Sequence, residues 1–180
     1  MATVVSIIKD PAGFWSDVVN PDYREFLERI DDLRRAFHCA ISLFHLADWI
    51  YVANRPAIDA SFTFTDKNGS GQRVYDEKTF ANALADICRE FELVRGIANS
   101  AKHLSLRSAG RDPSSPTHAA NTRSQSPGWG EGGYGSGPYG GTPRVMLEGP
   151  GGDDLEFSEL AQAVHNMWLS LSATHGWGLS

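Results

Sequence analysis

Cysteine is scarce in this chain of 180 residues: only Cys39 and Cys88 occur, and both fall inside predicted helices. The two thiols are not spaced as a Cys-x-x-Cys pair, which argues against a redox motif. We therefore expect two free, buried thiols, the state typical of a cytoplasmic protein. A disulfide between Cys39 and Cys88 is the less favoured alternative.

Long hydrophobic runs are also missing. No apolar segment approaches the roughly 20 residues that a membrane-spanning helix needs. Residues 1–10 lack both the basic start and the long apolar stretch of a signal peptide. We expect a cytoplasmic protein with no membrane association.

An excess of positive charge is absent as well. The net charge is −6, which argues against a surface dedicated to duplex DNA. The composition is 41% hydrophobic and 21% charged, as in ordinary globular proteins. A chain of this length is long enough to bury a sizeable core, so we expect residues 1–180 to form a single domain.

What the sequence does contain is two long apolar stripes at helical spacing, which predict a mainly α fold. The first helix is expected to begin at Asn20-Pro21-Asp22 and to end at Asn54-Arg55-Pro56, because a residue before proline avoids the helical conformation. The second is expected over residues 77–104, with Asp76 as its cap. Matched stripes favour an antiparallel pair. The stripes comprise Phe26, Ile30, Leu33, Phe37, Ala40, Phe44, Ala47 and Tyr51, then Phe80, Leu84, Ile87, Phe91, Val94, Ala98 and Ala101.

Shorter elements are predicted around this pair. A third, C-terminal helix is expected over residues 159–174, capped by Ser158 and ended by Gly176. Residues 61–65 alternate as in a short strand, and residues 145–147 and 155–157 predict a small β-hairpin. Residues 105–142 are rich in Ser, Pro and Gly, so we expect a flexible insertion with a mobile Gly-rich loop. Gly96, inside the second helix, indicates either a close helix crossing or sequence drift without a structural role.

Two polar clusters border the apolar stripes. His45 and Asp48 are three residues apart on the first helix, whereas Arg95, Asn99 and His103 are four apart on the second, so each set shares a helix face. An antiparallel pairing brings the clusters together only if the register allows it. One interpretation is a buried polar network with a purely structural role.

The other interpretation is a nuclease site, because the second helix resembles the HEPN superfamily of small helical domains. The family motif is an Arg followed after a few residues by a His on one helix, and here Arg95 precedes His103 with seven residues between them. The resemblance implies a metal-independent ribonuclease or toxin-type effector without a cofactor. In it, His103 acts as general acid and base on a ribose 2′-hydroxyl, and Arg95 or Lys102 holds the phosphate. It also implies RNA as substrate and a homodimer.

Two further alternatives stay open. A non-enzymatic interaction module would contact a protein partner through the aromatic side chains of the Gly-rich loop, namely Trp129, Tyr134 and Tyr139. A metal site built from His45, Asp48 and His103 is the least favoured alternative, because the sequence lacks the paired carboxylate and histidine motifs of di-iron bundles.

Overall fold

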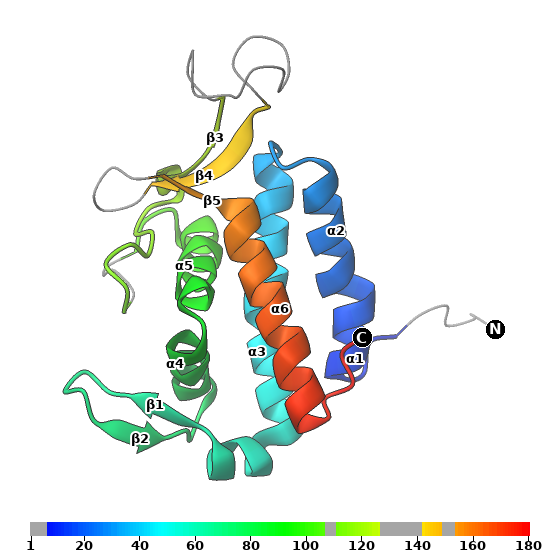
Figure 1. The fold of residues 1–180 in the computed structure, drawn as a ribbon, viewed down its shortest axis with the longest axis vertical. Helices are drawn as coiled ribbons and strands as arrows, with labels where there is room; N and C mark the ends of the chain where they lie inside the picture. Colours follow the sequence, from blue (N-terminus) through cyan, green and yellow to red (C-terminus); the bar gives the residue numbers. More distant parts are fainter. Residues whose placement is uncertain (1–6, 107–110, 127–141, 149–153) are drawn as a thin grey trace.

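The computed structural model describes residues 7–106, 111–126, 142–148 and 154–180 (Figure 1). In these ranges the protein is mainly helical, with two small antiparallel sheets. Trp129, Tyr134 and Tyr139 of the Gly-rich loop lie outside the described residues, as do residues 107–110. The predicted mobility of that loop therefore stays a prediction.

The N-terminal part of the chain forms one nearly continuous helical column. It consists of α1 (Pro11–Phe14), the π-helical turn Trp15–Val19 and α2 (Asn20–Glu28). Asp10 caps α1 by accepting a hydrogen bond from the amide of Gly13 at 2.8 Å. The helical chain thus starts upstream of Asn20, where the sequence analysis began the first helix.

The first long helix predicted from the sequence is interrupted. After α2, Arg29 leaves the helical conformation (φ −143°, ψ 71°), and α3 (Leu33–Ser61) begins with Asp32 as its cap. The prediction was wrong because the apolar spacing continues through Ile30 and Leu33, which hides the break. Pro56 does not end α3 either, because a kink at Asn54 (φ −126°, ψ 19°) accommodates the proline. At this kink the Asn54 side-chain amide donates to the carbonyl of Ile50 at 3.0 Å.

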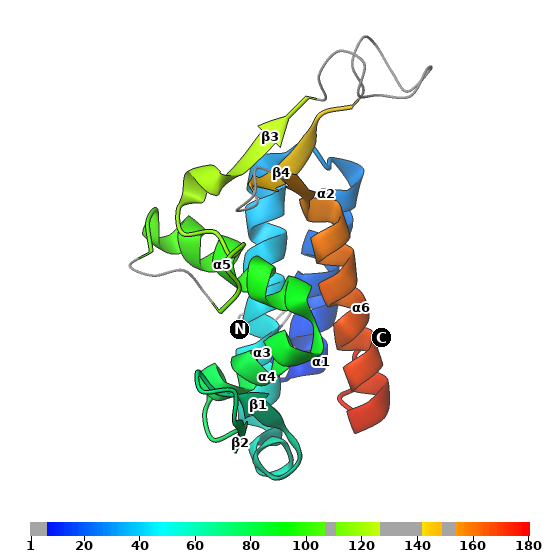
Figure 2. The same ribbon diagram turned by 60° about the vertical axis from the view of Figure 1, so that its left-hand side comes forward.

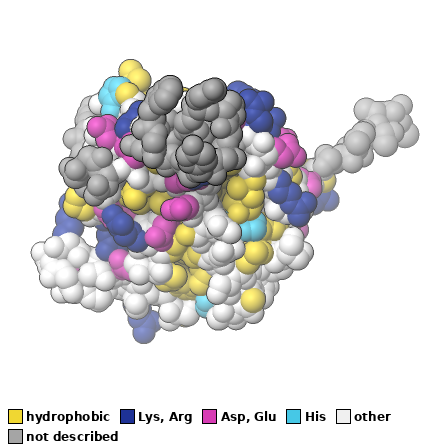
Figure 3. Space-filling view, turned by 45° about the horizontal axis from the view of Figure 1, so that its top comes forward, with side chains coloured by type: hydrophobic (Ala, Val, Ile, Leu, Met, Phe, Trp, Pro, Cys, Tyr) yellow, Lys and Arg dark blue, Asp and Glu magenta, His cyan; other side chains and the backbone are white. Residues whose placement is uncertain are grey.

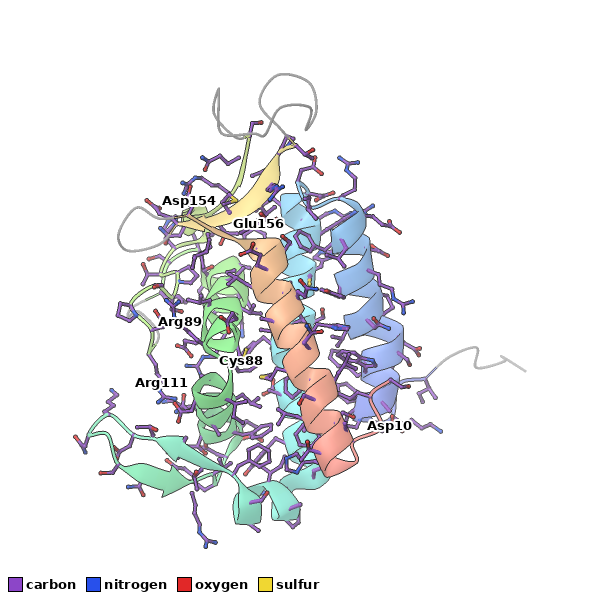
Figure 4. All side chains as sticks on the ribbon, viewed as in Figure 1. Asp10, Cys88, Arg89, Arg111, Asp154 and Glu156 are labelled. Carbon is purple, nitrogen blue, oxygen red and sulfur yellow. The ribbon has the colours of Figure 1, made fainter. Side chains whose placement is uncertain are left out.

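The second long helix is also divided, into α4 (Glu77–Ile87) and α5 (Arg89–His103). The break lies at Cys88, which adopts an extended conformation (φ −140°, ψ 108°). The cap predicted at Asp76 is confirmed, because its carboxylate accepts from the Thr79 amide at 2.7 Å. Cys88 lies between the two helices in Figure 4.

Both small sheets involve segments that the sequence predicted, together with two strands that it missed. The predicted strand β1 (Thr63–Thr65) pairs with β2 (Gly71–Arg73), which was not predicted. The predicted hairpin is formed by β4 (Arg144–Glu148) and β5 (Asp154–Glu156). A third strand, β3 (Thr122–Gln125), pairs with β4 and follows a 3-10 turn at Ala119–Asn121. It falls within residues 105–142 and was missed because its polar sequence carries no strand pattern.

The core forms around α3, which packs against α2, α4, α5 and α6 (Phe157–His175). The helix α3 runs antiparallel to α2 and α5, whereas α6 runs parallel to α3 and antiparallel to α5 (Figures 1 and 2). Trp168 of α6 is fully buried against α5, and its indole donates to the carbonyl of Leu43 at 3.1 Å. As predicted, α6 ends at Gly176, which has a positive φ of 71°, although its cap residue is Glu156 rather than Ser158.

By length and composition α3 would also suffice to cross a membrane. Half of its most apolar window is buried inside the protein, as expected for the central helix of a core.

Candidate functional site

A broad groove of about 1590 Å³ runs between α3, α4, α5, the β1–β2 hairpin and the segment 111–115. Its wall includes Asp48 of α3, Asn82 of α4 and Asn99 of α5. Phe44, Phe64 and Ala81 supply apolar surface. The groove therefore combines hydrogen-bonding groups with apolar patches, as ligand sites commonly do.

A buried charge pair lies at the wall of this groove. Glu92 is only 2% exposed, and its Oε1 accepts from the backbone amide of Arg111 at 2.6 Å. Its Oε2 forms an ion pair with the guanidinium of Arg95, without a well-aligned hydrogen bond. The same guanidinium donates to Asn82 Oδ1 at 3.1 Å. Since a buried carboxylate needs a counter-charge, the first role of Arg95 is to neutralise Glu92.

Arg111 extends this network to three other elements. Its guanidinium donates at 2.8 Å to the carbonyl of Asn82 in α4 and, at the same distance, to the carbonyl of Thr65 in β1. It also pairs with Asp86 at 2.8 Å. One residue further on, Asp112 pairs with Arg89 at the start of α5. Figure 4 shows Arg89 and Arg111 along the same edge of the molecule, beside α4 and α5.

Gly96 allows the segment 111–116 to lie directly on α5. A Cβ atom at this position would clash with Ser115 Oγ and would lie 2.6 Å from Cδ of Pro116. The close approach indicated by Gly96 is thus made by this segment and not by another helix. Without a side chain at position 96, the buried Ser115 reaches the carbonyl of Glu92 at 3.4 Å.

His103 is the last residue of α5, and both it and Lys102 are exposed. The chain turns sharply after it: Leu104 has a positive φ (φ 56°, ψ −49°), and the Ser105 amide donates to the His103 carbonyl at 2.5 Å. These angles and this bond define a γ-turn, a strained conformation for a residue other than glycine. Two residues later the chain is back at the groove, where Leu106 lines the wall.

The other predicted cluster is a half-exposed pair on α3. His45 Nδ1 lies 3.0 Å from Asp48 Oδ2, and the side chains are 49% and 47% exposed. One turn before Asp48, the ring of Phe44 lies 6.0 Å from that of Phe91 in α5. From this contact α3 runs about 6 Å in one direction to Asp48, and α5 runs about 12 Å in the other direction to Asn99. The register therefore keeps the two clusters apart along the groove.

This separation also bears on metal binding. Among the residues that the structure describes, no three His, Cys, Asp or Glu side chains are grouped so as to hold a metal ion. His45 and Asp48 are adjacent, but His103 lies at the far end of α5.

The sequence analysis missed Glu92, Asn82 and Arg111 as parts of the site. A signal for Glu92 was present: it follows the buried Phe91 and stands three residues before Arg95, the spacing of an ion pair on one helix face. Nothing local indicates that Arg111 closes the network, because it comes from a segment 19 residues away from Glu92.

No protein-family model, curated protein or solved structure matches this chain.

Proposed function

We propose that this protein is a metal-independent ribonuclease whose reacting group is His103. The observation that carries the proposal is the arrangement on α5. Asn99 lines the groove, and the exposed His103 stands one helical turn further on the same face. RNA lying in the groove would thus meet an imidazole at the end of the helix.

The chemistry needs only side chains of α5. His103 removes the proton from a ribose 2′-hydroxyl, and the 2′-oxygen then attacks the adjacent phosphorus. The bond from phosphorus to the 5′-oxygen breaks, the protonated His103 returns its proton to that oxygen, and a 2′,3′-cyclic phosphate forms. Lys102 offers a positive charge to the non-bridging oxygens, where negative charge develops.

In this proposal Arg95 has a different role from the one that the HEPN resemblance implies. Its side chain is 14% exposed and is engaged by Glu92 of α5 and Asn82 of α4, so it positions α5 against α4. Lys102 is the phosphate-binding cation, since among the described residues no carboxylate pairs with it.

The test is cleavage of a labelled single-stranded RNA in EDTA by the wild type, His103→Ala and His45→Ala. His45 is a matched control, because it is also an exposed helical histidine but lies on α3. We expect His103→Ala to lose cleavage and to keep its melting temperature, and His45→Ala to keep both. Equal cleavage by all three proteins would show that His103 is not the reacting group.

The resemblance also leads us to propose a homodimer. Sedimentation equilibrium of the wild type measures this directly, and a monomer at micromolar concentration would refute it.

A second candidate is a non-enzymatic interaction module, which the closed network of Glu92, Arg95 and Arg111 favours. Each of these charges has an ion-pair partner within the described residues, as expected of a structural polar network. Under this alternative the wild type cleaves no RNA in EDTA or in added divalent metal, and deletion of residues 126–142 abolishes binding of a protein partner.

A further inference from the structure

One stretch of the groove rim is rich in exposed cations around an exposed aromatic ring. Tyr75 is 61% exposed and lines the groove together with Lys67, Arg73 and Lys78, all of which are exposed. We call these four residues the hairpin platform, because they lie on and directly after the β1–β2 hairpin.

The cations of the hairpin platform are free. Among the described residues, none of the three forms an ion pair, whereas Arg89, Arg95 and Arg111 are each paired. The sheet at the other end of the molecule is also neutralised: Figure 3 shows basic and acidic side chains side by side there, and Arg123 pairs with Asp154 at 2.8 Å. Unpaired cations therefore distinguish the hairpin platform from these surfaces.

The two neighbouring aspartates, Asp66 and Asp76, accept hydrogen bonds from nearby backbone amides. Asp66 accepts from the amides of Asn68 (2.8 Å) and Ser70 (2.9 Å), which lowers its pKa. Asp76 is held by Thr79, whose side-chain hydrogen bond likewise lowers the pKa of the carboxyl. Both short side chains are fixed in a turn and a cap. Glu77 is the acid of this stretch that stays exposed at the groove.

The ring of Tyr75 is held in place before any ligand binds. Its backbone amide donates to Thr79 Oγ1 at 3.0 Å, and its ring packs edge-on to Phe64 with the centroids 6.4 Å apart. An aromatic ring fixed along one edge and open to solvent can stack on a base at little entropic cost.

We propose that the hairpin platform binds single-stranded RNA and guides it along the groove toward Asn99. Tyr75 stacks on one base, and Lys67, Arg73 and Lys78 contact the phosphates. A single strand is favoured over a duplex because a duplex keeps its bases stacked on one another and unavailable to Tyr75. The choice of RNA as the nucleic acid rests on the proposed function.

The test is binding of a labelled single-stranded RNA, measured by fluorescence anisotropy at several salt concentrations. All variants carry His103→Ala so that cleavage does not interfere. Each phosphate contact contributes about 0.7 to the salt slope of log affinity for a single strand. Lys67→Ala/Arg73→Ala/Lys78→Ala should therefore lower the slope by about 2. Tyr75→Ala should weaken binding about tenfold, and Tyr75→Phe should restore it.

A matched control removes the same charge elsewhere. Lys9, Arg24 and Arg34 are exposed, lie outside the groove and have no ion pair among the described residues. Replacing all three with Ala should leave the salt slope nearly unchanged. Three results would overturn the proposal: an equal decrease in the salt slope for both triple variants, binding of duplex RNA as tight as that of single-stranded RNA, or no binding of RNA at all.

The two proposals fail in different ways. RNA that binds through the hairpin platform but is not cleaved by the wild type leaves this inference standing and refutes the ribonuclease. RNA that is cleaved through His103 but binds the platform variants as tightly as their parent refutes this inference and leaves the ribonuclease standing.

Discussion

Gly96→Ala is expected to destabilise the protein, although alanine is the better helix former. In an unconstrained helix this change stabilises by about 1 kcal/mol. Here the new Cβ would lie 2.6 Å from Cδ of Pro116 and would clash with Ser115 Oγ. The proline ring cannot rotate away, so the segment 111–116 has to move off α5.

The magnitude follows from three contributions. Overpacking costs about 1–3 kcal/mol. Displacing the segment weakens the hydrogen bonds that Glu92 accepts from the Arg111 amide (2.6 Å) and from Ser115 Oγ (3.4 Å), at about 1 kcal/mol each. The helix propensity of alanine offsets about 1 kcal/mol. We expect a net loss of about 3 kcal/mol, or about 6–12 °C in melting temperature for a chain of this size.

The assay is thermal and urea unfolding of Gly96→Ala beside Gly13→Ala. Gly13 is also helical, but its Cβ would meet nothing closer than 3.4 Å, so that variant should gain up to about 1 kcal/mol. Adding Ser115→Ala and Pro116→Ala to Gly96→Ala removes the clashing atoms and should recover part of the loss through a favourable coupling. If Gly96→Ala is as stable as Gly13→Ala, the packing of the segment 111–116 on α5 is refuted.

Three further predictions concern stability. Glu92→Gln breaks a buried pair and should lower the free energy of unfolding by about 3 kcal/mol in urea, whereas Glu28→Gln, at a 73% exposed carboxylate, should change it by less than about 1 kcal/mol. Burial lowers the pKa of His165 below its usual 6.5. The folded protein therefore gains its full stabilisation from the neutral imidazole above about pH 6.5, and it loses this stabilisation as the pH falls through the folded-state pKa. His165→Phe should remove this loss from urea midpoints compared at about pH 7.5 and about pH 5. Leu104→Gly relieves the strained turn and should raise the melting temperature, and a decrease would show that the leucine side chain contributes more than the strain costs.

Local patterns determined much of the fold in advance. The cap at Asp76, the C-terminal helix ending at Gly176 and the pairing of β4 with β5 were all predicted, because each depends on residues close together in the chain. The clusters around His45 and His103 were also recognised from spacing alone, since positions three or four apart on a helix always share a face.

The breaks at Arg29 and Cys88 could not be predicted in the same way. The apolar spacing continues across both, so the periodicity that predicts a helix does not indicate where the chain leaves it. The strand β3 has no pattern of its own and exists because β4 offers it a partner.

The sequence by itself thus determined that the protein is mainly helical, that Asp76 caps a helix and which polar side chains share a helix face. The tertiary structure alone decided that Arg95 neutralises Glu92, that Arg111 closes the network and that the His45–Asp48 pair lies far from Asn99. The physical reason is how far apart in the sequence the interacting residues lie. Caps and helix faces depend on neighbours within a turn or two, whereas a buried ion pair and a helix register depend on elements that meet only when the core is packed.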